Sequence, residues 1–276
     1  MSVSIDEILN SYLENNKDFD SSIFFKNIND DFDKAQEAYL LGLKFYEKNI
    51  LGLTEKLFEF SLDILQKLNK NFELSFLLHS LASLKFKNNN IEEARLLFKK
   101  ALSIKKDLND NLGISLVLKD LAYLEESNNN IVEAIKLNKD SIKYLLEEKL
   151  LDDLLSVFLK LMDLDKENKK NYLAQSLYLC LNNNLSIESV FLIVVEFTKE
   201  FGIENEIIPL IVSTLNLVYT AKNNITPEIS KAFLEIISSY AFINKIDNLT
   251  EWIIKEKLDD IEFSFKRLEI FINSLL

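Results

Sequence analysis

An internal repeat marked by asparagine clusters constrains the fold of this chain more than any other feature. The asparagine triplets at 88–90 and 128–130 recur at a spacing of 40. Shifting the sequence by 40 also aligns apolar and small residues: Leu81-Ala82 with Leu121-Ala122, Ile91 with Ile131, and Glu93-Ala94 with Glu133-Ala134. One step back reaches Leu41-Gly42 and one step forward reaches Ala174 and Leu177. The sequence therefore predicts at least four tandem units.

Each unit is predicted to form two helices joined by an asparagine turn. In the second unit one helical apolar stripe runs through Leu77, Leu81 and Leu84, and a second through residues 91–102. Asparagine tolerates the left-handed backbone conformation and caps helix ends. The clusters can therefore replace glycine in a chain with only 4 Gly and 2 Pro. We expect helical hairpins that cannot cover their own apolar surfaces.

Composition excludes several classes of protein. With 48% apolar residues in 276, the chain can bury a core in one or two domains, and so few Gly and Pro argue against a many-stranded β-fold. A formal charge of −12 disfavours nucleic acid and membrane surfaces as partners. No apolar run reaches the length of about 18 residues that a membrane-spanning helix needs. The N-terminal sequence does not resemble a secretory signal, and with one cysteine these features favour a cytoplasmic protein.

The pattern resembles the tetratricopeptide repeat (TPR) family in its long-repeat variant. The family's leucine and small residue match Leu41-Gly42, Leu81-Ala82 and Leu121-Ala122, its later small residue matches Ala94, Ala134 and Ala174, and its aromatic matches Phe58, Phe98 and Tyr178. The departures are a period of 40 instead of 34, Thr54 in place of the small residue, Asn138 in place of the aromatic, and Lys85, Glu125 and Asp165 in place of large residues. The resemblance covers the segment from about 31 to 184 and implies an all-α, right-handed superhelical solenoid.

The flanking segments are also helical by pattern. Residues 1–30 are predicted to form an N-terminal cap, residues 31–184 four hairpins, and residues 185–276 C-terminal hairpins and a capping helix continuous with the solenoid. The expected C-terminal helices are 187–201, 204–221, 227–243, about 248–257, and 259–275. Thr226-Pro227 indicates a helix start and Gly202 a helix end. A helical bundle packed on the repeats would give the same pattern.

The sequence offers little for catalysis. His79 and Cys180 are the sole residues of their types, and no nucleotide-binding or metalloprotease motif is present. We expect Cys180 to be buried inside a hairpin. The acidic pairs Asp152-Asp153 and Asp259-Asp260 are explained by helix N-termini. The interpretation is a protein with no catalytic residues, no metal site and no cofactor.

The TPR resemblance implies that the first helices of the hairpins line a concave groove. Residues of this stripe are the partner-binding candidates: Tyr39, Leu43, Tyr46, Phe76, His79, Ser83, Phe86, Leu116, Lys119, Tyr123 and Leu159. Aromatic anchors with few polar groups are typical of surfaces that dock a helix or an extended peptide. Acidic residues on the stripe, such as Glu47 and Glu126, argue against a carboxylate clamp and favour an apolar partner with some basic character. In the alternative, Phe76 and Phe86 turn into the hairpin interface.

The leading functional prediction is a non-enzymatic adaptor or assembly component that holds a peptide or helix of a partner protein. One alternative is a long-repeat regulator that senses a signalling peptide. The short acidic segment before the repeats disfavours it, because such sensors usually add a larger N-terminal domain. Another alternative is a homo-oligomeric structural subunit that associates through Val190–Val195 and Ile207–Val218.

Overall fold

The computed structural model describes residue 25 and residues 28–183 and 185–275, and in these residues it is all-α, which confirms the predicted fold class. The described segments contain no strand. The chain divides into two compact units, 1–144 and 145–276. The predicted N-terminal cap falls mostly outside the described residues. Its residue Phe25 is buried and its ring stacks on Phe60 at 4.8 Å.

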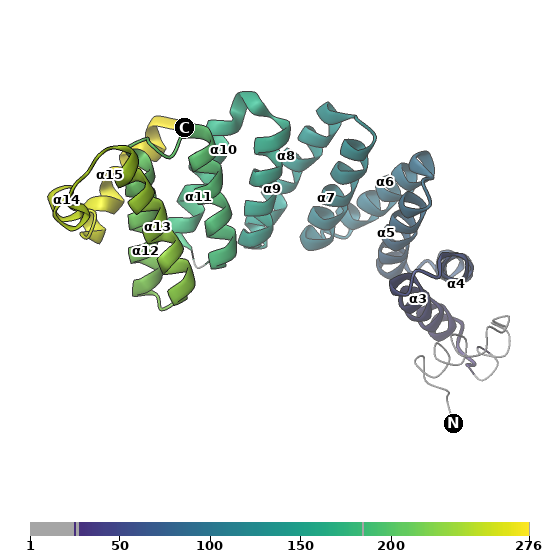
Figure 1. Ribbon diagram of the computed structural model, residues 1–276. Helices are drawn as coiled ribbons and strands as arrows, with labels where there is room; N and C mark the ends of the chain where they lie inside the picture. Colours follow the sequence, from purple (N-terminus) through teal and green to yellow (C-terminus); the bar gives the residue numbers. More distant parts are fainter. Residues whose placement is uncertain (1–24, 26–27, 184, 276) are drawn as a thin grey trace. The chain divides into compact units, whose positions relative to one another are not determined.

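The first unit is a series of antiparallel helices of equal length (Figure 1). Each helix has 17 residues, and the starts of successive helices are evenly spaced along the sequence. The bounds are α3 Asp31–Glu47, α4 Leu51–Lys67, α5 Asn71–Lys87, α6 Ile91–Asp107, α7 Asn111–Ser127 and α8 Ile131–Glu147, the last of which runs across the boundary at 144. The two helices predicted for each repeat are confirmed.

The turns between these helices share one backbone geometry. After α5, the N–H of Asn89 donates to the carbonyl of Phe86 at 2.9 Å and that of Asn90 to the carbonyl of Lys85 at 2.8 Å, which is a Schellman motif. This motif requires a left-handed residue, here Asn89 with φ of 64°. The same position has positive φ in every turn: Asn49, Asn69, Asn89, Asn109, Asn129 and Lys149. The backbone therefore repeats with every helix and its turn. This structural repeat is half as long as the repeat found in the sequence.

The core of the first unit comes from equivalent positions of successive helices. Leu74, Leu77, Leu78 and Leu81 of α5 and their counterparts in α7 are buried, as are Ala94, Leu97 and Phe98 of α6. Two of the departures from the TPR pattern, Thr54 and Asn138, fit into this core because their polar atoms form hydrogen bonds. Thr54 donates to the carbonyl of Ile50 at 3.1 Å, and Asn138 donates to the carbonyl of Ala134 at 2.9 Å.

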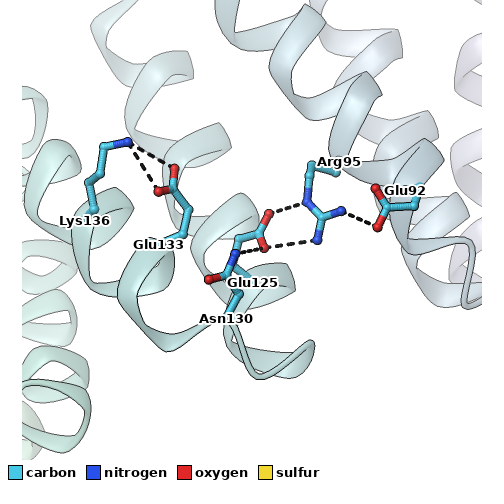
Figure 2. Close-up of polar contacts among 6 residues, drawn as sticks. All are labelled: Glu92, Arg95, Glu125, Asn130, Glu133 and Lys136. Atoms are coloured by element: carbon cyan, nitrogen blue, oxygen red, sulfur yellow. Dashed lines mark hydrogen bonds and ion pairs between the residues drawn. The ribbon is translucent and has the colours of Figure 1, made fainter.

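Two partly buried ion pairs join successive hairpins at equivalent positions with the charges reversed. Lys85 of α5 pairs with Glu55 of α4 at 2.6 Å. One repeat later Glu125 of α7 pairs with Arg95 of α6 at 2.5 Å, and Asn130 donates to the same carboxylate at 3.0 Å (Figure 2). Burial favours the neutral acid, but the Arg95 guanidinium and the Asn130 amide outweigh it and hold the pKa of Glu125 below its usual value.

The second unit begins with a shorter hairpin. Its elements are α9 Leu151–Leu164, the 3-10 turn η1 Lys166–Asn168, α10 Lys169–Asn182, α11 Ile187–Phe201, α12 Ile207–Ala221, α13 Pro227–Ile243, α14 Leu249–Lys255 and α15 Ile261–Leu275. The predicted C-terminal helices are confirmed, with α12, α14 and α15 beginning one to three positions late. Thr226 accepts a hydrogen bond from the Ile229 N–H, and Gly202 ends α11 with φ of 80°, as predicted.

The fourth hairpin packs on the C-terminal helices, and the boundary between the two compact units falls at 144. α10 contacts α11, α12 and α15. Tyr219 of α12 donates to the carbonyl of Cys180 at 3.4 Å, and Lys169 pairs with Glu200 of α11 at 3.1 Å. These contacts make α9 and α10 part of the second unit.

The apolar residues suggested for self-association lie mostly inside the second unit. Val190, Ile193 and Val194 of α11 are at most 1% exposed. Most of α12 is also buried, from Ile208 to Leu215. These side chains form part of the core of this chain, so most of the surface suggested for self-association, Val190–Val195 and Ile207–Val218, is covered within the chain itself.

Candidate functional site

A pocket of about 370 Å³ opens on the first unit between side chains of α3, α5, α6 and α7. Its lining residues are Tyr46, Ser83, Phe86, Lys87, Phe98, Asp120 and Tyr123. Tyr46, Ser83, Phe86 and Tyr123 are predicted binding residues, and the structure brings these four together. Because Ser83 and Tyr123 occupy corresponding places in successive repeats, the repeat itself generates the pocket.

The aromatic walls of the pocket are preorganised. Phe86 and Tyr123 lie edge to face, with ring centroids 5.7 Å apart and an interplanar angle of 83°. Tyr123 is 58% exposed, whereas Phe98, at 1%, lies beneath as part of the core. Exposed aromatic rings above a buried floor give the pocket apolar contact area at low conformational cost.

Charged groups stand at the edge of the pocket. Asp120 Oδ2 accepts a hydrogen bond from His79 Nε2 at 2.6 Å. Lys87 Nζ lies 4.7 Å from the centroid of the Tyr46 ring. Burial, and after it the negative charge of Asp120, raises the pKa of the Tyr46 hydroxyl. His79 therefore lies beside the pocket and not in its lining.

Phe76 and Leu116 lie nearer the first turns of α5 and α7. Phe76 is 36% exposed and Leu116 40% exposed, so neither is enclosed in a hairpin interface. Lys105 Nζ covers the Phe76 ring at 3.7 Å, and Phe72 meets it edge to face at 5.0 Å. Phe86 is half-buried and lines the pocket. Phe86 also packs against the core, so the alternative in which it turns inward holds in part for Phe86.

The other predicted site residues lie outside the pocket. Tyr39 is half-buried and its hydroxyl is 2.9 Å from Ser80 Oγ. Leu43 is half-buried against the core, and Lys119 is half-buried on α7. Leu159 is half-buried on α9, in the second unit. These four remain predicted binding residues for which the pocket provides no evidence.

Sequence reasoning missed Asp120 and Phe98 as pocket residues. The repeat pattern assigns Phe98 to the hairpin interface, and its burial agrees with that role although it also lines the pocket. Asp120 follows His79 by 41, so a search for hydrogen-bonding partners one repeat plus one position apart would have found the pair.

Cys180 is buried, as predicted. Burial, with a smaller contribution from the charge of Asp152, raises the pKa of its thiol to about 12. A thiol of this kind is protonated near neutral pH and is a poor nucleophile. The described residues contain no cluster of three or more His, Cys, Asp or Glu side chains that could hold a metal ion. Nor is any described helix both long and apolar enough to cross a bilayer.

The fold has counterparts among solved structures. BtubC (BKLC) from P. vanneervenii is 12% identical, with a TM-score of 0.50 over 89% of this chain and 89% of that chain. The chain has the fold of a TPR-like helical-repeat protein. This agrees with the resemblance read from the repeat residues.

Two further structures with the same kind of repeat match less well. Aspartyl phosphate phosphatase F from Bacillus subtilis is 13% identical, covering 90% of this chain and 62% of that chain with a TM-score of 0.49. A putative kinesin light chain from Podosopora anserina with nearly identical TPR-like repeats is 12% identical, covering 80% of this chain and 100% of that chain with a TM-score of 0.43. No protein-family model and no curated protein matches the sequence.

Proposed function

We propose that this protein is a non-enzymatic adaptor or assembly component that binds a peptide or helical segment of a partner protein in the cytoplasm. The observation that carries the proposal is the convergence of Tyr46, Phe86 and Tyr123 from three helices on one pocket. An anchor side chain covered by such rings contributes about 1–3 kcal/mol. Exposed aromatic rings around a pocket are typical of protein-binding surfaces.

The fold supports the same proposal. In TPR-like repeats each hairpin adds an equivalent helix to one continuous surface, which suits the capture of an elongated segment. In the first unit α5 and α7 contribute corresponding residues to the pocket, and Tyr46 of α3 extends it.

The test is quantitative co-purification of partners from the source cell with the Phe86→Ala/Tyr123→Ala variant. We expect the partners recovered with the wild type to decrease at least tenfold, because the variant removes two walls of the pocket. Phe242→Ala is the matched control, since Phe242 is 87% exposed on α13 and lies far from the pocket in sequence. Equal recovery with wild type and the double variant, at an unchanged circular dichroism spectrum, would refute the proposal.

A peptide-sensing regulator is the second candidate. The pocket has a size that suits part of a short peptide. A sensor must also change the arrangement of its repeats when the peptide binds. Small-angle scattering separates the two functions. An adaptor retains its dimensions when the bound segment is added, whereas a sensor changes its radius of gyration.

A further inference from the structure

One side of the pocket carries an accessible negative charge. The Asp120 side chain is 52% exposed, and its Oδ2 atom is held by His79 Nε2. This hydrogen bond fixes the carboxylate next to Tyr123 of the same helix and Tyr46 of α3. A carboxylate that is positioned but still half exposed can accept further hydrogen bonds from a ligand.

The aromatic wall already binds a cation of the chain itself. Lys87 Nζ lies 4.7 Å from the Tyr46 centroid, within the range of a cation–π contact. The pocket thus combines aromatic rings with a carboxylate, the two kinds of group that attract a guanidinium or ammonium group. An acidic side chain would instead meet the negative charge of Asp120.

A patch of exposed apolar side chains lies on the same two helices, toward their first turns. Phe72 is 54% exposed, Phe76 36%, Leu112 46% and Leu116 40%. Phe76 precedes Phe86 by ten positions, which is about 15 Å along a helix. An extended peptide covers that distance with about five residues. One short segment can therefore reach both the patch and the pocket.

We propose that the pocket takes a cationic side chain of the partner, arginine or lysine, while apolar residues of the same segment lie on Phe72, Phe76, Leu112 and Leu116. This inference rests on the proposed function and names the chemistry of the segment that it binds. The charge of −12 on the whole protein increases the rate of encounter with a basic segment.

Lys87 provides a way to distinguish a cationic ligand from an anionic one. Its ammonium group repels an incoming cation and competes for the Tyr46 ring. Lys87→Ala should therefore tighten the binding of a basic segment, by about two- to fivefold. If the pocket instead takes an acidic side chain, the same variant weakens binding because an attractive charge is lost.

The experiment selects random displayed peptides on the full-length protein and retains those whose binding is lost in Phe86→Ala/Tyr123→Ala. Synthetic copies are then compared with copies in which each arginine is replaced by the neutral isostere citrulline. We expect one citrulline to weaken binding about tenfold, and this ratio to fall below about twofold in the isosteric variant Asp120→Asn.

The outcomes separate this inference from the proposed function. Pocket-dependent peptides that bind equally well with citrulline, or that Lys87→Ala weakens, overturn the cationic preference and leave the adaptor function intact. Selection that yields no pocket-dependent peptide overturns both. Circular dichroism of each variant shows whether the fold is retained, and citrulline exchange in the ligand tests the preference without altering the protein.

Discussion

At the residue scale, two glycines on neighbouring helices differ in the room that they leave for a side chain. Gly42 stands where the next two repeats have Ala82 and Ala122. A Cβ atom at Gly42 would come within 2.6 Å of Phe58 Cε1, because the Phe58 ring packs directly on this turn of α3. Gly52 at the start of α4 is different, since a Cβ atom there meets nothing within 4 Å. Substitution by alanine should therefore change the free energy of unfolding in opposite directions at these two positions.

We predict that Gly42→Ala lowers the free energy of unfolding by about 1–3 kcal/mol, because the buried Phe58 ring must move to admit the methyl group. Gly52→Ala is the control, and it should raise the free energy of unfolding by up to about 1 kcal/mol through helix propensity. Urea denaturation followed by circular dichroism measures both. An unchanged midpoint for Gly42→Ala would mean that the Phe58 ring relaxes freely.

At the element scale, hairpins are joined by polar pairs as well as by apolar packing. The Arg95 and Glu125 side chains are 18% and 3% exposed, so removal of one partner leaves a buried charge. The pair between Glu133 and Lys136 in Figure 2 lies within one helix, and Lys136 is 63% exposed. Solvent screens that second pair, and it should contribute little to stability.

We predict that Arg95→Glu destabilises the protein by about 3–5 kcal/mol, because two carboxylates then face each other in a buried interface. The double change Arg95→Glu/Glu125→Arg restores the opposite charges in reverse order and should recover most of this loss. Lys136→Glu is the exposed control, with an expected cost below about 1 kcal/mol. Chemical denaturation of the wild type, Arg95→Glu, Glu125→Arg and the double variant gives the coupling energy. An absence of recovery in the double variant would contradict the pairing.

Much of the fold could be predicted from the sequence because repetition amplifies a weak local signal. The alignment of the sequence with itself located the hairpins, and helical apolar spacing gave the C-terminal helices. The shorter structural period was missed because the turns at Asn69 and Asn109 use a single left-handed asparagine without a triplet. A left-handed Lys149 shows that the turn geometry tolerates residues that carry no turn signal.

The candidate site was predictable only in part. Tyr46, Ser83, Phe86 and Tyr123 follow from equivalent places in successive repeats. The role of Asp120 depends on a contact between α5 and α7, and Phe98 reaches the pocket from a second helix. Such contacts depend on the packing angle between helices, which apolar periodicity does not specify.

At the scale of the whole molecule, sequence repeats and compact units do not coincide. The fourth repeat ends near 184 by sequence, but its helix α10 packs on α11, α12 and α15. Leu177, Cys180 and Leu181 of α10 are at most 5% exposed in the full chain. Removal of the C-terminal helices would uncover part of this helix, whereas α5, α6 and α7 belong to the first unit.

We predict that a fragment of residues 1–184 loses hydrogen-exchange protection in α9 and α10, because it lacks the helices that cover them. Protection in α5 and α6 should match the full chain, which makes these helices the internal control. Exchange measured by mass spectrometry on both proteins checks this. Equal protection of α9 and α10 in the fragment would show that the fourth hairpin is stable without the C-terminal helices.

The reversed ion pairs also limit how the gene for this protein can change in length. The uniform turns would let recombination remove one whole repeat without altering the backbone path at the junction. Excision of residues 71–110, however, would place Glu55 opposite Glu125, two acids where the two native junctions with Lys85 and Arg95 each have an acid and a base. Loss of residues 71–150 would place Glu55 opposite Asp165, which is again an acid. The repeats are therefore alike in backbone shape, but the charges at these two junctions make them unequal when one repeat is removed.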